Sequence, residues 1–368
     1  MPAASYYMSD AARAHDPDEP ARQGRLSRLR AEALAFSHPD PHLVEAWVAA
    51  RDSAVTPLRE QGGYAAGSRL IQFEEAALAA FSALAIGARE QARTRIAALA
   101  AERSGLVIAW LIGRYYALTG DLEATSWLRP ALEALRFSDS VAVQSMPQGR
   151  GQRDPLLPLV AYALLPLAEA TGDRELATSA RQLAAGADPG QSVDSVLCRL
   201  ADISPAGRGR PLEALSGLFE GETEAGASTW ETILRASADG EGSWIVPILV
   251  AGILGLDPDA DRGRLRLRLH APAAWPSWSA ENIRVGDATI TVSIQRDDES
   301  VAIRADQTAG AMPLTLILEP TIQAPVAACF VDDTPADLAV RPSARHVVVP
   351  VQLALDAPRE LRIALGPR

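Results

Sequence analysis

Residues 253–267 read ILGLDPDADRGRLRL, and within this stretch the chain changes its hydrophobic periodicity. Residues 257–263 combine aspartates with a proline and a glycine, which interrupt a helix and favour a turn. From residue 264 onward arginine alternates with leucine, and period-two alternation is typical of a strand that buries one face. The stretch therefore predicts the boundary between a helical part and a β part. We interpret the arginines at 264–268 as the solvated face of that strand.

On the N-terminal side, segments rich in alanine and leucine follow helical periodicity. We expect helices over residues 24–36, 41–60, 69–85, 88–102, 105–118, 122–136, 155–170, 174–185, 191–202, 209–219, 226–236 and 243–254. Thr119-Gly120-Asp121 and Thr171-Gly172-Asp173 each join two of them, because glycine ends a helix in the left-handed conformation and aspartate caps the next one. Ile86-Gly87-Ala88 is a weaker copy. Such joints predict stacked antiparallel helix pairs, as in a solenoid or a closed toroid.

On the C-terminal side, short alternating segments are separated by turn residues, with no helical segment between them. We expect strands over residues 264–270, 290–295, 301–306, 314–318, 327–331, 346–353 and 360–365. This pattern is typical of an antiparallel β-sandwich. Trp275 and Trp278 precede most of these strands, and we expect them to pack in the seam between the two parts.

A chain of 368 residues is long enough for two hydrophobic cores. We expect a polar, flexible tail at residues 1–22, a helical-hairpin domain at 23–256, and a linker with a β-sandwich domain at 257–368. The fold class is therefore mainly α plus β.

Composition excludes several classes of function. The net charge of −11 leaves no basic face for a nucleic acid. The longest apolar run, residues 244–256, is too short to span a membrane, and we expect neither a membrane partner nor a secretory signal. Cys198 and Cys329 are expected to be buried thiols in a cytoplasmic protein. The five histidines have no metal-ligand spacing, and we expect no metal and no cofactor.

Several short motifs follow one another along the chain, and their order can be compared with known families. They are Gly63-Tyr64-Ala65-Ala66-Gly67, then residues 113–122 (GRYYALTGDL), then Ala161-Tyr162-Ala163 ahead of residues 170–173 (ATGD), and finally residues 253–267. This order resembles the six-hairpin glycosidases with an (α/α)₆ toroid, namely the bacterial glycogen-debranching and glucoamylase-like enzymes. The resemblance covers roughly residues 40–300. It implies a toroid packed against the β-sandwich, and a role in carbohydrate metabolism.

The resemblance also implies where catalytic carboxylates belong, since glycoside cleavage requires a pair of them. Glu75 stands where relatives carry an aspartate, and Glu74 stands where they carry an arginine. Arg103 and Leu156 occupy two further positions that are acidic in relatives, with Glu102 and Asp154 nearby as substitutes. The catalytic motifs are therefore degenerate.

The candidate catalytic pair is Glu75 and Glu241, and the candidate substrate-binding residues are Tyr64, Glu74, Asp154 and Trp244. Structural roles compete with each of these, because acids near a helix start, an aspartate before proline and a tryptophan at helical spacing are common without any ligand. Three functions follow: a non-catalytic or weakly active relative that binds a glycan or a protein, an active inverting hydrolase of an α-glucan or oligosaccharide, or a helical-repeat scaffold. The sequence leaves the oligomeric state open.

Overall fold

The computed structural model describes residues 19–56, 69–102, 106–127, 157–172, 174–185, 234–235, 244–270, 272–342 and 346–367. Its helices include α1 (Glu19–Glu32), α2 (Pro41–Val55), α3 (Arg69–Ala85), α4 (Arg89–Glu102), α5 (Leu106–Thr119), the 3-10 helix η2 (Leu122–Trp127), α7 (Leu157–Ala170), α8 (Arg174–Ala184), α12 (Ile245–Pro247), the π-helix η5 (Ile248–Ile253) and the 3-10 helix η6 (Ala260–Arg262). Its strands include β1 (Ala35–Ser37), β2 (Leu256–Asp259), β3 (Arg264–Leu267), β4 (Ser277–Val285), β5 (Ala288–Arg296), β6 (Ser300–Ala309), β7 (Thr315–Leu318), β8 (Thr321–Ile322), β9 (Val326–Val331), β10 (Thr334–Pro335), β11 (Arg341–Pro342), β12 (Val347–Val348), β13 (Val351–Ala354) and β14 (Arg359–Leu365).

The strands pair in a seven-stranded sheet with the order β1-β4-β5-β6-β14-β9-β10, a four-stranded sheet with the order β13-β7-β3-β2, and a short three-stranded sheet. The pair β3–β7 is parallel, and the other pairs of the described sheets are antiparallel. Alternate residues of β5 are buried, as the period-two pattern predicts. The sheets therefore agree with the expected antiparallel character except where β3 lies beside β7.

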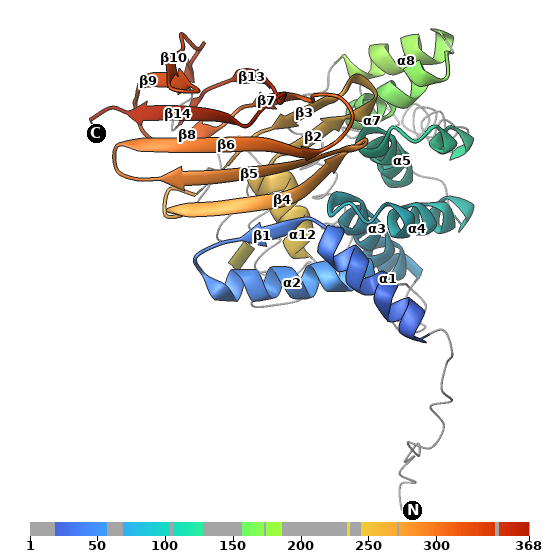
Figure 1. The fold of residues 1–368 in the computed structure, drawn as a ribbon. Coiled ribbons are helices and arrows are strands. Elements are labelled where there is room, and N and C mark those ends of the chain that lie inside the picture. Colours follow the sequence, from blue (N-terminus) through green and yellow to red (C-terminus); the bar gives the residue numbers. More distant parts are fainter. Residues whose placement is uncertain are drawn as a thin grey trace, which may run out of the picture.

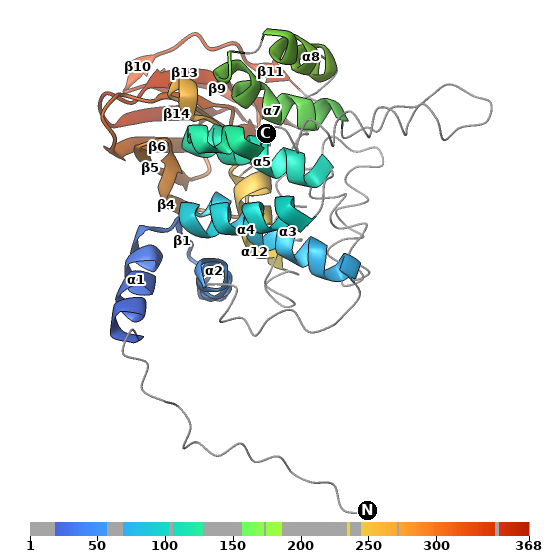
Figure 2. The same ribbon diagram turned by 90° about the vertical axis from the view of Figure 1, so that its right-hand side faces the viewer.

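The helices pack beside the sheets, with α3 against α4, α5 against α7, and α7 against α8 (Figure 1; Figure 2). Gly87, Gly120 and Gly172 all have positive φ, at 83°, 64° and 72°, and each ends a helix. Asp121 accepts a hydrogen bond from the backbone N–H of Glu123 at 2.9 Å, which caps η2. The predicted helix joints are thus confirmed at these glycines. The aspartate of the second joint, Asp173, lies outside the described residues.

Helices α5 and α7 approach each other unusually closely at Gly113. A Cβ atom at Gly113 would lie 2.5 Å from the carbonyl carbon of Ala163 and 2.9 Å from the backbone nitrogen of Leu164, with the carbonyl oxygen of Ala163 closer still. These are backbone atoms of α7, which cannot rotate away. Only glycine permits this contact, and the contact sets the distance between the two helices that lie next to the turn between β2 and β3.

One continuous hydrophobic core joins the helices to both larger sheets. Its aromatic part lies where β1 meets β4: the ring centroid of Phe36 is 6.1 Å from Trp47, 6.1 Å from Trp275 and 6.3 Å from Trp278. Trp275 and Trp278 are almost fully buried. The prediction that these two tryptophans pack in the seam between the helical and β parts is confirmed.

Two strands of four or more residues were not predicted: Leu256–Asp259 form β2, where a turn was expected from residue 257, and Ser277–Val285 form β4. Three predicted helices also differ from the structure. The first helix ends at Glu32, and Ala35–Ser37 instead pair with β4 as an edge strand, because Phe36 enters the aromatic cluster there. The segment after Gly120 begins as a 3-10 helix rather than an α-helix. Residues 248–253 form a π-helix, all of whose residues are buried. In each case tertiary packing overrides the local helical pattern.

None of the helices in the described part of the chain is long and apolar enough to cross a membrane. Cys329 lies on β9 as a buried free thiol, and burial raises its pKa. Cys198 lies outside the described residues.

Acid is expected to destabilise the protein through His270, which follows β3. Its Nδ1 atom lies 3.2 Å from Thr321 Oγ1. Loss of hydration lowers the pKa of His270 to about 4, with smaller contributions from Arg268 and His346. An unfolded histidine has a pKa of about 6.5. The unfolded state therefore binds the proton more readily, and stability is lost as the pH falls from about 6.5 towards 4.

We expect the free energy of unfolding in urea to be about 1–2 kcal/mol lower at pH 5 than at pH 7.5 on account of this group. His270→Gln should remove that part of the pH dependence, whereas substitution of the exposed His42 by glutamine should keep it. An unchanged pH dependence in His270→Gln would show that other groups cause the acid sensitivity.

Candidate functional site

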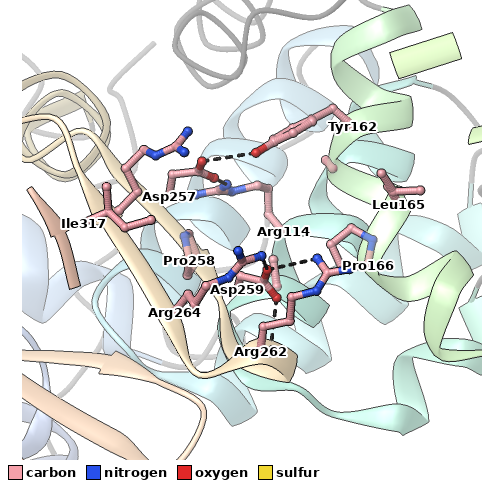
Figure 3. Close-up of a pocket in the computed structure, with 13 residues that line it drawn as sticks. Arg114, Tyr162, Leu165, Pro166, Asp257, Pro258, Asp259, Arg262, Arg264 and Ile317 are labelled. Carbon is pink, nitrogen blue, oxygen red and sulfur yellow. Dashed lines mark hydrogen bonds and ion pairs between the residues drawn. The ribbon is translucent and has the colours of Figure 1, made fainter. Parts of the chain in front are cut away.

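A cavity of about 250 Å³ lies where helices α5 and α7 meet the hairpin formed by β2, η6 and β3 (Figure 3). Polar and apolar residues line it together: Arg114, Ala117, Tyr162, Ala163, Leu165, Pro166, Asp257, Pro258, Asp259, Arg262, Arg264, Arg266 and Ile317. The cavity therefore coincides with the stretch of sequence at which the helical part gives way to the β part.

The hairpin presents its charged residues to the cavity because of strand alternation. Leu265 and Leu267 are fully buried in the core, so the intervening arginines of β3 point to the opposite face. In the antiparallel register Asp257 stands opposite Arg266, and Asp259 stands opposite Arg264. Residues directly opposite each other share a face. Two aspartates and two arginines are thereby placed on the side that the helices cover.

The turn between these strands is built by two further features. Asp259 accepts a hydrogen bond from the backbone N–H of Arg262 at 3.3 Å, which caps η6. Gly263 then adopts φ +57°, a left-handed conformation that glycine tolerates without a steric penalty. Arg262 and Arg264 are consequently held on either side of Asp259.

Arg114 of α5 is the most deeply buried charge of the site, with 4% of its side chain exposed. Its Nη1 donates to Asp257 Oδ1 at 3.0 Å, and its Nη2 donates to the carbonyl oxygen of Leu256 at 2.7 Å. The hydroxyl of Tyr162, from α7, donates to the other carboxylate oxygen of Asp257 at 3.3 Å. Figure 3 shows Arg114 and Tyr162 converging on Asp257. Two helices are thus joined to β2 through one carboxylate.

A second cluster surrounds Asp259. Arg264 Nη2 lies 2.6 Å and Arg262 Nη1 lies 3.2 Å from Asp259 Oδ2. Arg262 also donates to Glu169 of α7 at 2.6 Å, and Glu169 accepts two hydrogen bonds from Arg181 of α8. This chain of ion pairs connects α8 and α7 to the hairpin.

The environment shifts the pKa values of two of these groups in opposite directions. Burial, followed by the charge of Asp257, raises the pKa of Tyr162 to about 12, so its hydroxyl keeps its proton at neutral pH. The hydrogen bonds from Arg181 and then Arg262 hold the pKa of Glu169 below its usual value. The cavity thus offers a hydroxyl, guanidinium groups and ion-paired carboxylates for hydrogen bonding.

Most residues predicted as functional lie away from this cavity or outside the described residues. Tyr64, Asp154 and Glu241 lie outside the described residues. Glu74 and Glu75 lie on α3, for which only the backbone is described at these positions. Trp244 precedes α12, is partly buried and packs against the hydrophobic core. The pairing of Glu75 with Glu241 remains a prediction.

Arg114, Tyr162, Asp257 and Asp259 were not predicted as site residues, although all four lie in the short motifs that resemble glycosidases. The predicted solvated face of residues 264–268 holds only in part: Arg264 is 43% exposed. Arg266 and Arg268 are only 30% and 22% exposed, and Glu319 pairs with both. Only the order of the motifs along the chain indicated that these segments are neighbours in the folded protein. Among the residues that the structure describes, no group of three or more histidine, cysteine, aspartate or glutamate side chains could hold a metal ion.

No protein-family model matches the sequence, and no curated protein matches it significantly. An α-L-rhamnosidase from Dictyoglumus thermophilum matches in fold with 9% identity and a TM-score of 0.48, over 90% of this chain and 50% of that chain. A structure described as a glycoside hydrolase matches with 9% identity and a TM-score of 0.37, over 91% and 77% of the two chains. A GH127 β-L-arabinofuranosidase from Geobacillus stearothermophilus T6 matches with 9% identity and a TM-score of 0.30, over 88% and 75%. These structural neighbours are glycoside hydrolases, and the chain spans half the length of the rhamnosidase.

Proposed function

We propose that the protein is a diverged relative of the six-hairpin glycosidases that binds a carbohydrate without cleaving it. The observation that carries the proposal is the cavity at the junction of the helical and β parts, where Tyr162, Asp257 and four arginines gather around about 250 Å³ of space. The degenerate catalytic motifs at Glu74, Glu75, Arg103 and Leu156 support a binding role over a hydrolytic one.

The walls of the cavity suit the two sides of a sugar ring. Carboxylates accept hydrogen bonds from hydroxyl groups, and guanidinium groups donate them in a fixed fork. Leu165, Pro166, Pro258 and Ile317 add apolar surface on which the C–H face of a ring can rest. The volume is slightly below the range of about 300–1,000 Å³ typical of ligand pockets, which fits one monosaccharide unit.

The hydrogen bonding in the cavity opposes hydrolysis there. Asp257 and Asp259 are two residues apart on β2, about 6.6 Å along a strand, which is near the separation that an inverting pair requires. Both carboxylates, however, already accept hydrogen bonds from arginines. A general acid must instead donate a proton to the leaving oxygen. The pair therefore acts as acceptors, which suits binding.

The test is a screen of the purified chain against α- and β-linked oligosaccharides, measuring binding by calorimetry and cleavage by release of reducing sugar. We expect binding without release. If the chain releases reducing sugar and Glu75→Gln abolishes that release, the protein is a hydrolase and the proposal is contradicted. A protein that melts cooperatively and binds no sugar would contradict it as well, and would favour the scaffold function.

A tyrosine pair tests whether the sugar binds in this cavity. Tyr162→Phe should weaken sugar binding about two- to tenfold, because one hydrogen bond contributes about 0.5–1.5 kcal/mol. Tyr116→Phe is the matched control, since its hydroxyl donates to Asp261 in the same turn but does not line the cavity. Equal affinities for the two variants would place the sugar elsewhere.

A further inference from the structure

Arg266 differs from the other arginines of the cavity in its partners. Arg114, Arg262 and Arg264 each hold a carboxylate at 2.6–3.2 Å. Among the described residues, the nearest carboxylate to Arg266 is that of Glu319, whose Oε2 lies 3.9 Å from Arg266 Nε. That nitrogen is buried and has no hydrogen-bond partner within the described part of the chain. Arg266 is therefore the cavity cation whose hydrogen-bonding capacity is least used.

Glu319 compensates the charge of Arg266 only weakly. The same Oε2 lies closer to Arg268 Nε, at 3.2 Å, and the other carboxylate oxygen lies 3.8 Å from Arg341. One carboxylate is thus shared among three arginines. At these distances, near 4 Å, Glu319 still attracts Arg266 and Arg341, but it is too far away to accept a hydrogen bond from either.

The lining of the cavity as a whole is also positive. It contains four arginines and two aspartates, and both aspartates are already engaged by Arg114, Arg262 and Arg264. An added anion would therefore meet, in Arg266, a cation with unused hydrogen-bond donors, without breaking a hydrogen-bonded ion pair. Because Arg266 is only 30% exposed, such an anion would be less screened by solvent than at a surface arginine.

We propose that the carbohydrate bound in this cavity carries an oxyanion, either a carboxylate or a phosphate group, and that Arg266 anchors it. The inference rests on the proposed carbohydrate binding and names the chemical class of the ligand. The guanidinium fork matches the geometry of both oxyanions. Tyr162 lines the same cavity, where its neutral hydroxyl can bond to the hydroxyl groups of the ring.

The experiment is calorimetric titration of the full chain at fixed ionic strength with D-glucose, D-glucuronate, D-glucose 6-phosphate and inorganic phosphate. We expect at least one of the two charged sugars to bind about tenfold more tightly than glucose, and its affinity to fall as salt is added. The two charged sugars distinguish a carboxylate ligand from a phosphate ligand. Glucose binding as tightly as both would overturn the inference.

Variants of two arginines make the test specific. Arg266→Gln should weaken binding of the charged sugar about tenfold, and Arg266→Lys should retain part of the affinity. Arg359→Gln is the matched control, because Arg359 is similarly exposed, at 31% against 30%, but pairs with Asp332 away from the cavity. Unchanged affinity in Arg266→Gln, or an equal loss in Arg359→Gln, would overturn the inference.

The inference and the proposed function can fail separately. One result would support carbohydrate binding and reject the oxyanion: neutral oligosaccharides bind, Tyr162→Phe weakens their binding, and charged sugars bind no more tightly than neutral ones. If inorganic phosphate binds as tightly as glucose 6-phosphate and no sugar adds affinity, Arg266 holds an anion but the carbohydrate proposal is wrong.

Discussion

Replacing Gly113 by alanine is expected to lower the free energy of unfolding by about 1–2 kcal/mol. The added methyl group would enter the backbone of α7 at Ala163 and Leu164, at distances that Cβ atoms do not adopt. The two helices would have to separate, and overpacking of this kind costs about 1–3 kcal/mol or more. The higher helix propensity of alanine, compared with glycine, offsets only about 1 kcal/mol of this cost. Urea denaturation monitored by circular dichroism measures the difference.

Gly24→Ala is the matched control for this prediction. Gly24 also lies inside a helix, but a Cβ atom there would meet no other atom within 4 Å. Its replacement should therefore stabilise α1 by up to about 1 kcal/mol through helix propensity alone. If Gly113→Ala proved as stable as Gly24→Ala, the close approach of α5 and α7 would be wrong.

Separation of these helices would also widen the cavity, so Gly113→Ala should weaken ligand binding.

Replacing Arg114 by methionine is expected to destabilise the protein by about 3 kcal/mol or more. Arg114 and Asp257 are 4% and 15% exposed, and removal of one partner leaves the other charge buried without its counter-ion. Breaking a buried ion pair in this way typically costs about 3–5 kcal/mol. The hydroxyl of Tyr162 would remain as a partner of Asp257 and offsets part of the loss. Urea denaturation at neutral pH measures the change.

A surface ion pair provides the comparison. Arg181 binds Glu169 at 2.6 Å but is 56% exposed, so Arg181→Met should cost about 1 kcal/mol or less. The double variant Arg114→Met with Asp257→Asn removes both charges and should recover part of the stability lost in the single variant. Equal losses for Arg114→Met and Arg181→Met would show that burial does not strengthen the role of Arg114.

Much of the fold could be predicted because its signals are local. The alternation at residues 264–270 reports one buried face of a strand, and β3 forms there with Leu265 and Leu267 in the core. Gly120 and Gly172 end helices because glycine alone accepts a left-handed conformation without cost. Such features depend on a few neighbouring residues, so their patterns can be interpreted before the chain is folded.

The candidate site was predicted poorly because its contacts join distant segments. Arg114 and Asp257 are 143 residues apart, and nothing near either residue indicates that they will meet. The arginines of β3 carry the pattern of a strand with one polar face, but the pattern does not reveal whether water or a helix covers that face. The motifs that resembled glycosidase hairpins indicated the neighbourhood without indicating the contacts.

The sequence by itself determined the change from helices to strands near residue 256, the glycine-ended helix joints and the alternation that buries the leucines of β3. Backbone preference and hydrophobic burial are properties of short segments, which is why these features can be predicted. Only the tertiary structure decided that Ala35–Ser37 join the sheet and that Gly113 lets α5 and α7 touch. It also decided that Arg266 lines a cavity with no carboxylate of the described residues within hydrogen-bond distance. These outcomes depend on which distant residues become neighbours, since the energy of a charge or a close contact is set by all the groups that surround it.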